Sequence, residues 1–551
     1  MKLTLYNKNV LNSMYSYKKI RFPIVLSILI VLNGCQTEQA INERPAMMRD
    51  LVLGDYAVGY KTIFTYDQTR NGVPYADWDG NLTNNHRPEL GRQFQINVWY
   101  PAESGSGDQI NYSHYVYLRG RQTDFGESEE QKESAKQMFI EQTQGLGNVT
   151  VGVLGSTKED FTSEHLNQLL ELEVFGRLNA TPLKGKFPVV IYPNGGSPAF
   201  QSITCEYLAS HGYVVVAFTT KGRFSSGMEI STIGLEVAVD DFEFVLGKVS
   251  EQSNVNMDKV AIVANAISSS VGAAAISRND KLKALVSLEG GLPSAFEQGL
   301  LNESVFYTPE NITAPILIIY SSHPSIDPEY TFHLKYADRY YAQFANMSEW
   351  TMLNYGMFDA FVPNILGEHK GNTQKGFKEA HQLVLRFLDQ EIKGKTDVLF
   401  EATFLNALTE LDSTFVLEGI PSPPNIAVLK DRFMKDGFDE IERIYAVLKE
   451  KGNLQPYSKS FYKDYRSWLA WQKDEEYIYR QRLYELGYDS YPESARMNYY
   501  LAYYSMMVGE KAKAIRHYKT TLSLVENDPD LTSSERESII NYSKSDLKEL
   551  E

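Results

Sequence analysis

Strands and helices alternate along residues 187–393, and this alternation constrains the fold more than any other feature of the sequence. Short, mostly apolar runs mark the expected strands at 187–192, 213–218, 260–263, 284–288, 315–320 and 349–355. Continuous apolar runs are typical of strands buried on both faces of a parallel sheet. Helical patterns lie between and after them, at about 202–212, 239–246 and 373–393. The sequence therefore predicts a doubly wound α/β sheet, in which ligands collect at the carboxyl ends of the strands.

The strand expected at 260–263 leads directly into a run of small residues, Ala264-Asn265-Ala266-Ile267-Ser268-Ser269. A nucleophile elbow needs a serine on a tight, strained turn between a strand and a helix, with small residues two places to either side. Aligning this pattern puts Ala264 and Ser268 at the small-residue places and Ala266 at the place of the serine. Alanine has no nucleophilic atom, so the sequence predicts the elbow without its reactive group.

Four further segments, taken with this turn, resemble the platelet-activating factor acetylhydrolase and dienelactone hydrolase-like branch of the α/β-hydrolases: Gly59-Tyr60, Asn97–Ala102, Tyr207–Val215 and Leu282–Gly290. The resemblance covers about residues 51–400. It implies an α/β-hydrolase-like domain over 51–418. Residues from about 125 to 180, rich in Glu, Gln and Lys with apolar residues at helical spacing, predict a helical insertion in this domain, and such insertions often lie over a pocket as a lid. The resemblance also implies that Glu289 is the triad acid, which is an aspartate in the acetylhydrolases.

The resemblance further implies a catalytic histidine after the last strand, in a short His-x-x-Phe-like turn. Here that turn is 356–361, and Met357 takes the place of the histidine to within one residue. No histidine occurs from 334 to 368. Without a serine there is no acyl-enzyme, and without an imidazole there is no general base.

The loop after the strand at 187–192 is expected to keep its function. Asn194, Gly195 and Gly196 could offer backbone N–H groups of the oxyanion-hole type. A pocket that keeps these donors and lacks a nucleophile suits binding of a small ester-like or lipid ligand without hydrolysis. We therefore expect a degenerate serine-hydrolase site, with triad-equivalent positions Ala266, Glu289 and Met357.

A second alignment, shifted by two residues, leaves an active enzyme open. The run Ala266-Ile267-Ser268-Ser269-Ser270 also has the outline of the elbow, and it makes Ser268 the nucleophile of a carboxylic-ester hydrolase. The base would then be His323, which follows an expected strand, or His369. In the alternative interpretation, Ser268 to Ser270 are small packing residues at the start of a helix.

The N-terminus predicts a lipoprotein. Five basic and no acidic side chains occur in the first 34 residues, and an apolar run at 22–31 has the length of a signal-peptide core. Leu32-Asn33-Gly34-Cys35 then resembles the lipobox of bacterial lipoproteins, in which the cysteine is diacylated and becomes the new N-terminus. We expect a signal peptide over 1–34, lipidation of Cys35, a tether over 35–50, and a bacterial envelope location, in the outer membrane. An ordinary signal peptide or membrane anchor with an incidental cysteine is the alternative.

A second, helical region follows the proline-rich segment 420–424. Counting from Ala495, five residues occupy consensus places of the 34-residue tetratricopeptide repeat: Leu501, Ala502, Gly509, Ala514 and Tyr518. We expect an all-α tetratricopeptide-like region over 425–551 that binds a protein partner, with a plain helical bundle as the alternative. A third hypothesis for the whole chain is an interaction protein: the repeats bind the protein partner, and the hydrolase fold is only a scaffold.

Composition excludes several other classes of function. The formal net charge of −16 at pH 7 and a pI of about 5.2 give no electrostatic footprint for nucleic acid. The two cysteines and the scattered histidines have no metal-ligand spacing, and no phosphate-binding or dinucleotide glycine motif occurs. No metal and no cofactor are therefore expected.

Overall fold

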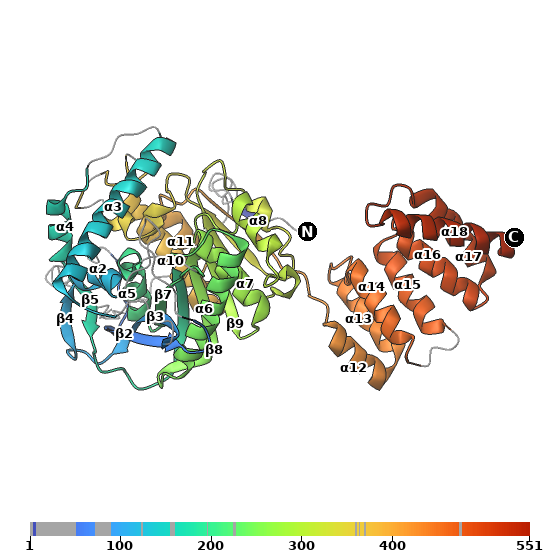
Figure 1. The fold of residues 1–551 in the computed structure, drawn as a ribbon, viewed down its shortest axis with the longest axis horizontal. Coiled ribbons are helices and arrows are strands. Elements are labelled where there is room, and N and C mark those ends of the chain that lie inside the picture. The colour runs from blue at the N-terminus through green and yellow to red at the C-terminus, as the bar shows by residue number, and fades with distance from the viewer. Residues whose placement is uncertain are drawn as a thin grey trace, which may run out of the picture. The chain divides into compact units, whose positions relative to one another are not determined.

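The computed structural model describes residues 4–6, 51–71, 90–122, 125–154, 160–194, 197–223, 227–358, 361–362, 364–367, 371–472 and 477–551. It divides the chain into two compact units, Lys2–Gly419 and Ile420–Glu551 (Figure 1). The boundary falls at the proline-rich segment 420–424. Among the residues described, no helix is both long enough and apolar enough to cross a membrane.

One sheet runs through the first unit, in the order β1-β12-β11-β10-β9-β8-β6-β7-β3-β2-β5-β4. Its strands are β1 (Thr4–Tyr6), β2 (Ala57–Asp67), β3 (Arg92–Ala102), β4 (Asp108–Asn111), β5 (Glu173–Leu178), β6 (Phe187–Asn194), β7 (Val214–Thr219), β8 (Val255–Asn265), β9 (Leu282–Leu288), β10 (Ile316–Tyr320), β11 (Arg339–Gln343) and β12 (Ser413–Leu417).

The eight strands from β2 to β11 have the arrangement of an α/β-hydrolase. Strand β3 is antiparallel to β2 and to β7, whereas β7, β6, β8, β9, β10 and β11 are parallel to one another. The parallel strands therefore end at one edge of the sheet, where ligands of such folds collect. The expected fold class, an α/β-hydrolase-like sheet followed by an all-α region, is confirmed.

Helices cover both faces of the sheet, because its central strands are apolar on both sides (Figure 1). On β6, Val190 and Tyr192 pack with one cluster, and Val189 and Ile191 pack with the other. Burying one such side chain stabilises the fold by about 1.5–3 kcal/mol. The first cluster is covered by α5 (Ser202–Ser210) and α10 (Thr373–Glu391), and the second by α6 (Thr232–Ser250), α7 (Ile267–Arg278) and α8 (Ala295–Glu303).

The expected helical stretch at 125–180 contains two helices, α3 (Glu129–Leu154) and α4 (Ser163–Leu170), beside the short α2 (Ser113–Tyr117). Its end is not helical, because Val174 lies on β5, which pairs with β2 and β4. Helix α3 packs on the first cluster through Phe139, whose ring centroid lies 5.5 Å from that of Phe200.

The strand expected at 349–355 does not form, and this prediction is wrong. Residues 350–352 form a 3₁₀ turn, followed by the short helix α9 (Tyr355–Phe358). The polar groups of Asn354 bond to a distant segment instead of a neighbouring strand. Its amide donates to Ala199 O over 2.5 Å, and its backbone N–H donates to Phe200 O over 2.8 Å. The last parallel strand is β11, whose tyrosines pair with β10 and β12.

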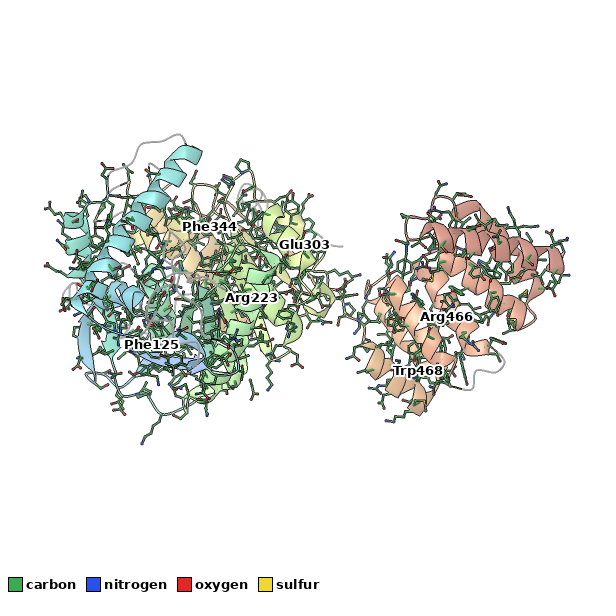
Figure 2. The ribbon with its side chains drawn as sticks, viewed as in Figure 1. Phe125, Arg223, Glu303, Phe344, Arg466 and Trp468 are labelled. Atoms are coloured by element: carbon green, nitrogen blue, oxygen red, sulfur yellow. The ribbon has the colours of Figure 1, made fainter. Side chains whose placement is uncertain are left out.

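The second unit is entirely helical in its described residues. Its helices are α12 (Ile426–Asp436), α13 (Phe438–Glu450), α14 (Lys459–Leu469), α15 (Ile478–Ser490), α16 (Ala495–Met507), α17 (Lys511–Leu524) and α18 (Ser533–Leu550); α11 (Ala402–Ala407) belongs to the first unit. Ala502, Ala514 and Tyr518 form a buried contact between α16 and α17. Aromatic packing dominates, and the Arg466 guanidinium lies 4.2 Å from the ring centroid of Tyr500 (Figure 2).

Candidate functional site

The turn between β8 and α7 has the strained backbone of a nucleophile elbow, and Ala266 occupies it. This residue has φ 46° and ψ −136°, a conformation that costs a residue with a side chain about 1–3 kcal/mol. Its N–H donates to Leu288 O over 3.2 Å and to Glu289 O over 3.1 Å, which ties the turn to the end of β9. The backbone of the elbow is present, with a methyl group where a nucleophile would stand.

The chain turns sharply where β9 ends, next to Ala266. Glu289, Gly290 and Gly291 all have positive φ, at 25°, 72° and 65°. A Cβ atom on Gly291 would lie 2.5 Å from Ala266 O, so only glycine fits beside the elbow. This turn directs the Glu289 side chain to the carboxyl edge of the sheet.

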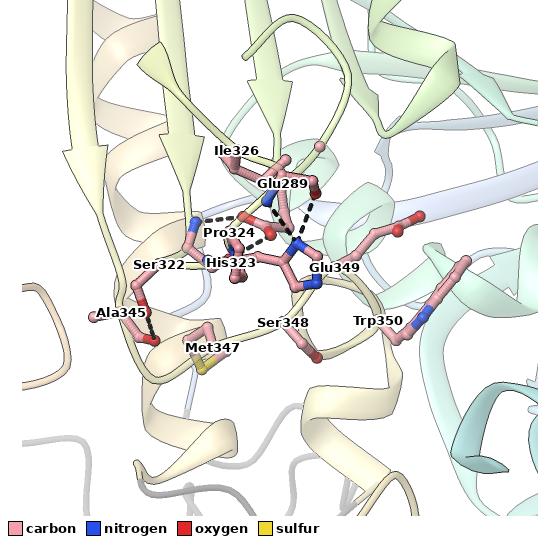
Figure 3. Close-up of a pocket in the computed structure, with 13 residues that line it drawn as sticks. Glu289, Ser322, His323, Pro324, Ile326, Ala345, Met347, Ser348, Glu349 and Trp350 are labelled. Atoms are coloured by element: carbon pink, nitrogen blue, oxygen red, sulfur yellow. Dashed lines mark hydrogen bonds between the residues drawn. The ribbon is translucent and has the colours of Figure 1, made fainter. Parts of the chain in front are cut away.

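A pocket of about 320 Å³ opens at this edge, where β9, β10 and β11 end (Figure 3). One loop contributes Glu289 and Gly290, and the segments Ser321–Ile326 and Ala345–Trp350 contribute the rest of the wall. Gly290 also adjoins the elbow, because a Cβ atom there would lie 3.5 Å from the Ala266 Cα. Figure 3 shows His323 and Glu349 extending from the two larger loops.

Glu289 is bound to the loop that follows β10. The Ser321 hydroxyl donates to Oε1 of Glu289 over 2.6 Å, and the Ser321 backbone N–H donates to Oε2. Burial nevertheless raises the pKa of Glu289 to about 7, although these hydrogen bonds oppose the rise.

Glu349 is a second carboxyl in the same wall. Burial, and after it the negative charges of Glu289 and Glu297, raise its pKa to about 8. No lysine or arginine is among the described residues that line the pocket. The site thus holds two carboxyl groups that resist ionisation, because burial disfavours their charged forms and no cationic side chain among the described lining residues offsets them.

The structure does not bring the expected alternative nucleophile and base together. Ser268 lies on the first turn of α7 and is 3% exposed. His323 lies in the pocket wall, where its ring bonds to Ser325. His369 lies outside the described residues, and no histidine among those described hydrogen bonds to Ser268.

Met357 lies on α9 and is buried among apolar side chains of the first cluster. It is not among the residues that line the pocket. Its assignment to the histidine place depended on the strand expected at 349–355, and the loop that follows the last parallel strand is instead 344–350.

Part of the predicted oxyanion loop can be placed. Asn194 is the last residue of β6, at the same edge of the sheet as the elbow, whereas Gly195 and Gly196 lie outside the described residues. Cys35 also lies outside them. Within the described part of the chain, no group of three histidine, cysteine, aspartate or glutamate side chains could hold a metal ion.

Sequence reasoning placed His323 at this edge of the sheet, but it missed the serines of the same loop, Ser321, Ser322 and Ser325, and it missed Glu349. The loop could have been found, because it directly follows the strongly apolar strand 315–320 and loops at that edge carry ligand sites. Glu349 could not have been found in the same way, because the sequence placed it at the start of a strand that does not form.

Comparisons with known proteins give structural neighbours of low sequence identity and low TM-score. No protein-family model matches the sequence, and no curated protein matches it. A ferulic acid esterase from Streptomyces cinnamoneus is 15% identical, with 65% of this chain and 96% of that one covered and a TM-score of 0.43. A puromycin-hydrolyzing peptidase of Mycobacterium tuberculosis is 16% identical, with 39% and 35% covered and a TM-score of 0.29. The Pyrococcus horikoshii acylaminoacyl peptidase is 14% identical, with 40% of each chain covered and a TM-score of 0.31.

Proposed function

We propose that this chain is a lipid-anchored protein of the bacterial envelope whose α/β-hydrolase-like unit binds a small ester-like or lipid ligand, without forming an acyl-enzyme at the elbow. Ala266 carries the proposal. It holds the strained conformation in which hydrolases present their nucleophile, and it has no atom that could attack a carbonyl.

The pocket supports binding as the remaining role of this edge. It adjoins the elbow through Gly290, and its wall combines apolar side chains such as Trp350 with polar side chains such as Glu349. Apolar surface with converging polar groups is a common setting for a ligand site. Ser268 offers no substitute nucleophile in the described structure, because it is buried and has no histidine partner.

Hydrolysis of 4-nitrophenyl acetate and butyrate tests the elbow. We expect Ser268→Ala to release 4-nitrophenol at the same rate as the wild-type protein. A robust wild-type rate that disappears in Ser268→Ala would overturn the proposal. Binding is tested by saturation-transfer NMR with ethyl butyrate, where Ser348→Trp should abolish the transfer by filling the pocket.

The anchor and the helical unit extend the proposal beyond the pocket. Cys35 is the acylation site, and two or more acyl chains give stable attachment where one gives only marginal binding. Metabolic labelling with a palmitate analogue should mark the wild-type chain and not Cys35→Ala, and equal labelling would exclude this anchor.

The helical unit is proposed as a tetratricopeptide-like surface for a protein partner. The buried contact of Ala502, Ala514 and Tyr518, with Gly509 at φ 87° between the two helices, supports this assignment. Crosslinking in cells should lose its partners when 425–551 is deleted, and an unchanged set of partners would refute the role of this unit.

A further inference from the structure

A serine and a histidine are paired within the pocket wall, away from the elbow. Oγ of Ser325 lies 2.6 Å from Nδ1 of His323, and both residues line the pocket. Figure 3 shows the His323 ring in this wall. Both side chains are exposed, so a ligand in the pocket can reach them.

The direction of this hydrogen bond follows from a second one. The backbone N–H of Ser325 lies 3.2 Å from the same Nδ1 atom. A backbone N–H can only donate, so Nδ1 is the acceptor and carries no proton. The Ser325 hydroxyl must then be the donor in the 2.6 Å contact, and the ring proton is on Nε2. A serine that donates to a neutral imidazole is in the ground state for general-base activation.

The loop that carries the pair is fixed at both ends. At its start, the His323 N–H donates to the Ser321 hydroxyl over 3.1 Å, and Ser321 in turn donates to Glu289. At its end, Asp327 N donates to Pro293 O over 2.7 Å. Glu289 therefore holds the loop in place and is a positioning residue, since it makes no hydrogen bond to the imidazole of His323 in the described structure.

We propose that Ser325 is an acyl acceptor and His323 its general base, acting on small, activated carboxylic esters that enter the pocket. Oγ of Ser325 forms a bond to the carbonyl carbon while its proton moves to Nδ1 of His323. The bond from that carbon to the leaving oxygen then breaks, and the imidazolium returns the proton to this oxygen. The products are acyl-Ser325 and the free alcohol. This inference goes beyond the proposed function, which concerns the elbow.

A fluorophosphonate probe tests the pair on the full-length chain in detergent, with the adduct located by peptide mass mapping. We expect one adduct, on Ser325, that is absent in Ser325→Ala. General-base catalysis contributes about 10²–10⁴-fold, so His323→Asn should slow labelling at least about 100-fold. Ser250→Ala is the control, because Ser250 is an exposed serine at the end of α6 that bonds to Gly247 O and does not line the pocket, and this variant should label at the wild-type rate.

Three results would overturn the proposal: no adduct on Ser325, an adduct elsewhere that Ser325→Ala leaves unchanged, or the same labelling rate in His323→Asn as in the wild type. The last result would identify Ser325 as merely an exposed serine. Failure here is distinct from failure of the proposed function, which only labelling or turnover that depends on Ser268 would overturn. Circular dichroism of each variant shows whether the fold is intact.

Discussion

Replacing Glu349 by glutamine should stabilise the protein at high pH and leave it unchanged at low pH. The pKa of this carboxyl rises from its ordinary 4.5 to about 8 on folding, through burial first and then through the charges of Glu289 and Glu297. Between pH 4.5 and 8 the folded chain holds a proton that the unfolded chain has released. Stability therefore falls as the pH rises through this window.

The size of the effect follows from the two pKa values. Each pH unit between them is worth about 1.4 kcal/mol, so ionised Glu349 lowers the free energy of unfolding at pH 9 by up to about 5 kcal/mol. Because the Glu349 carboxyl is partly exposed to water, the actual loss of unfolding free energy is smaller than this upper value. A glutamine has nearly the same shape and never ionises, so we expect Glu349→Gln to be about 2–5 kcal/mol more stable than the wild type at pH 9. At pH 4.5 the two should agree within about 1 kcal/mol.

Urea unfolding at the two pH values measures this difference, and hydrogen exchange of peptides from β9 and β10 reports the first unit separately. Glu251→Gln is the control, because Glu251 is exposed and forms only a surface ion pair with Lys248. It should change the free energy of unfolding by less than about 1 kcal/mol at either pH. The prediction is contradicted if Glu349→Gln changes the free energy of unfolding equally at pH 4.5 and pH 9, or lowers it at pH 9. Either result would show that the Glu349 carboxyl is not buried.

Two further predictions concern the two units separately. Asp241→Asn should lower the free energy of unfolding by about 3–5 kcal/mol, because it leaves the Arg92 guanidinium without its anion. Arg92 is 3% exposed, and its guanidinium donates to both Asp241 oxygens over 2.6 Å. Urea unfolding measures the loss, with Glu243→Gln as the control. That variant breaks an exposed ion pair with Arg278 and should lower the free energy of unfolding by less than about 1 kcal/mol. Equal losses in the two variants would contradict the prediction. In the helical unit, Gly509→Ala should cost about 1 kcal/mol through backbone strain alone, since φ is 87° and no atom lies within 4 Å of the new Cβ. Gly247→Ala, inside helix α6 and equally free of contacts, should instead gain up to about 1 kcal/mol in thermal unfolding, and a loss at both sites would refute the argument from φ.

The sheet could be predicted from the sequence where strands are buried on both faces. Such strands are continuous apolar runs, and β6 to β10 lie within a few residues of the expected ranges. Strand β11 was missed because it is short and has Arg339 at one end and Gln343 at the other. Arg339 is 2% exposed even so, because its guanidinium donates to Ala337 O and Phe332 O. Side-chain hydrogen bonds to backbone carbonyls, such as these, leave no periodic pattern in the sequence.

The elbow could be located from the sequence, whereas the part of the pocket wall formed by Ala345–Trp350 could not. The small residues around Ala266 reflect close packing of β8 on α7, which is a local property of the chain. The segment 349–355 is rich in residues that favour strands, yet the contacts of Asn354 with Ala199 and Phe200 hold it in turns. Those partners are about 150 residues away, so no local pattern could place Glu349 in the pocket.

Retention of Glu289 and of the elbow has an explanation that does not depend on catalysis at Ala266. The strained turn lets Ala266 N–H bond to the end of β9, and Gly291 then packs on Ala266 O, so the packing of β8, α7 and β9 requires this backbone with or without a nucleophile. Glu289 likewise fixes the loop after β10 through both polar groups of Ser321. Removing the nucleophile therefore relieves neither the strain nor the burial of the carboxyl, because both belong to the architecture of this edge. A carboxyl at the triad acid position is consequently weak support for an active elbow in a fold of this kind, and the groups that can still react must be sought in the loop that Glu289 holds.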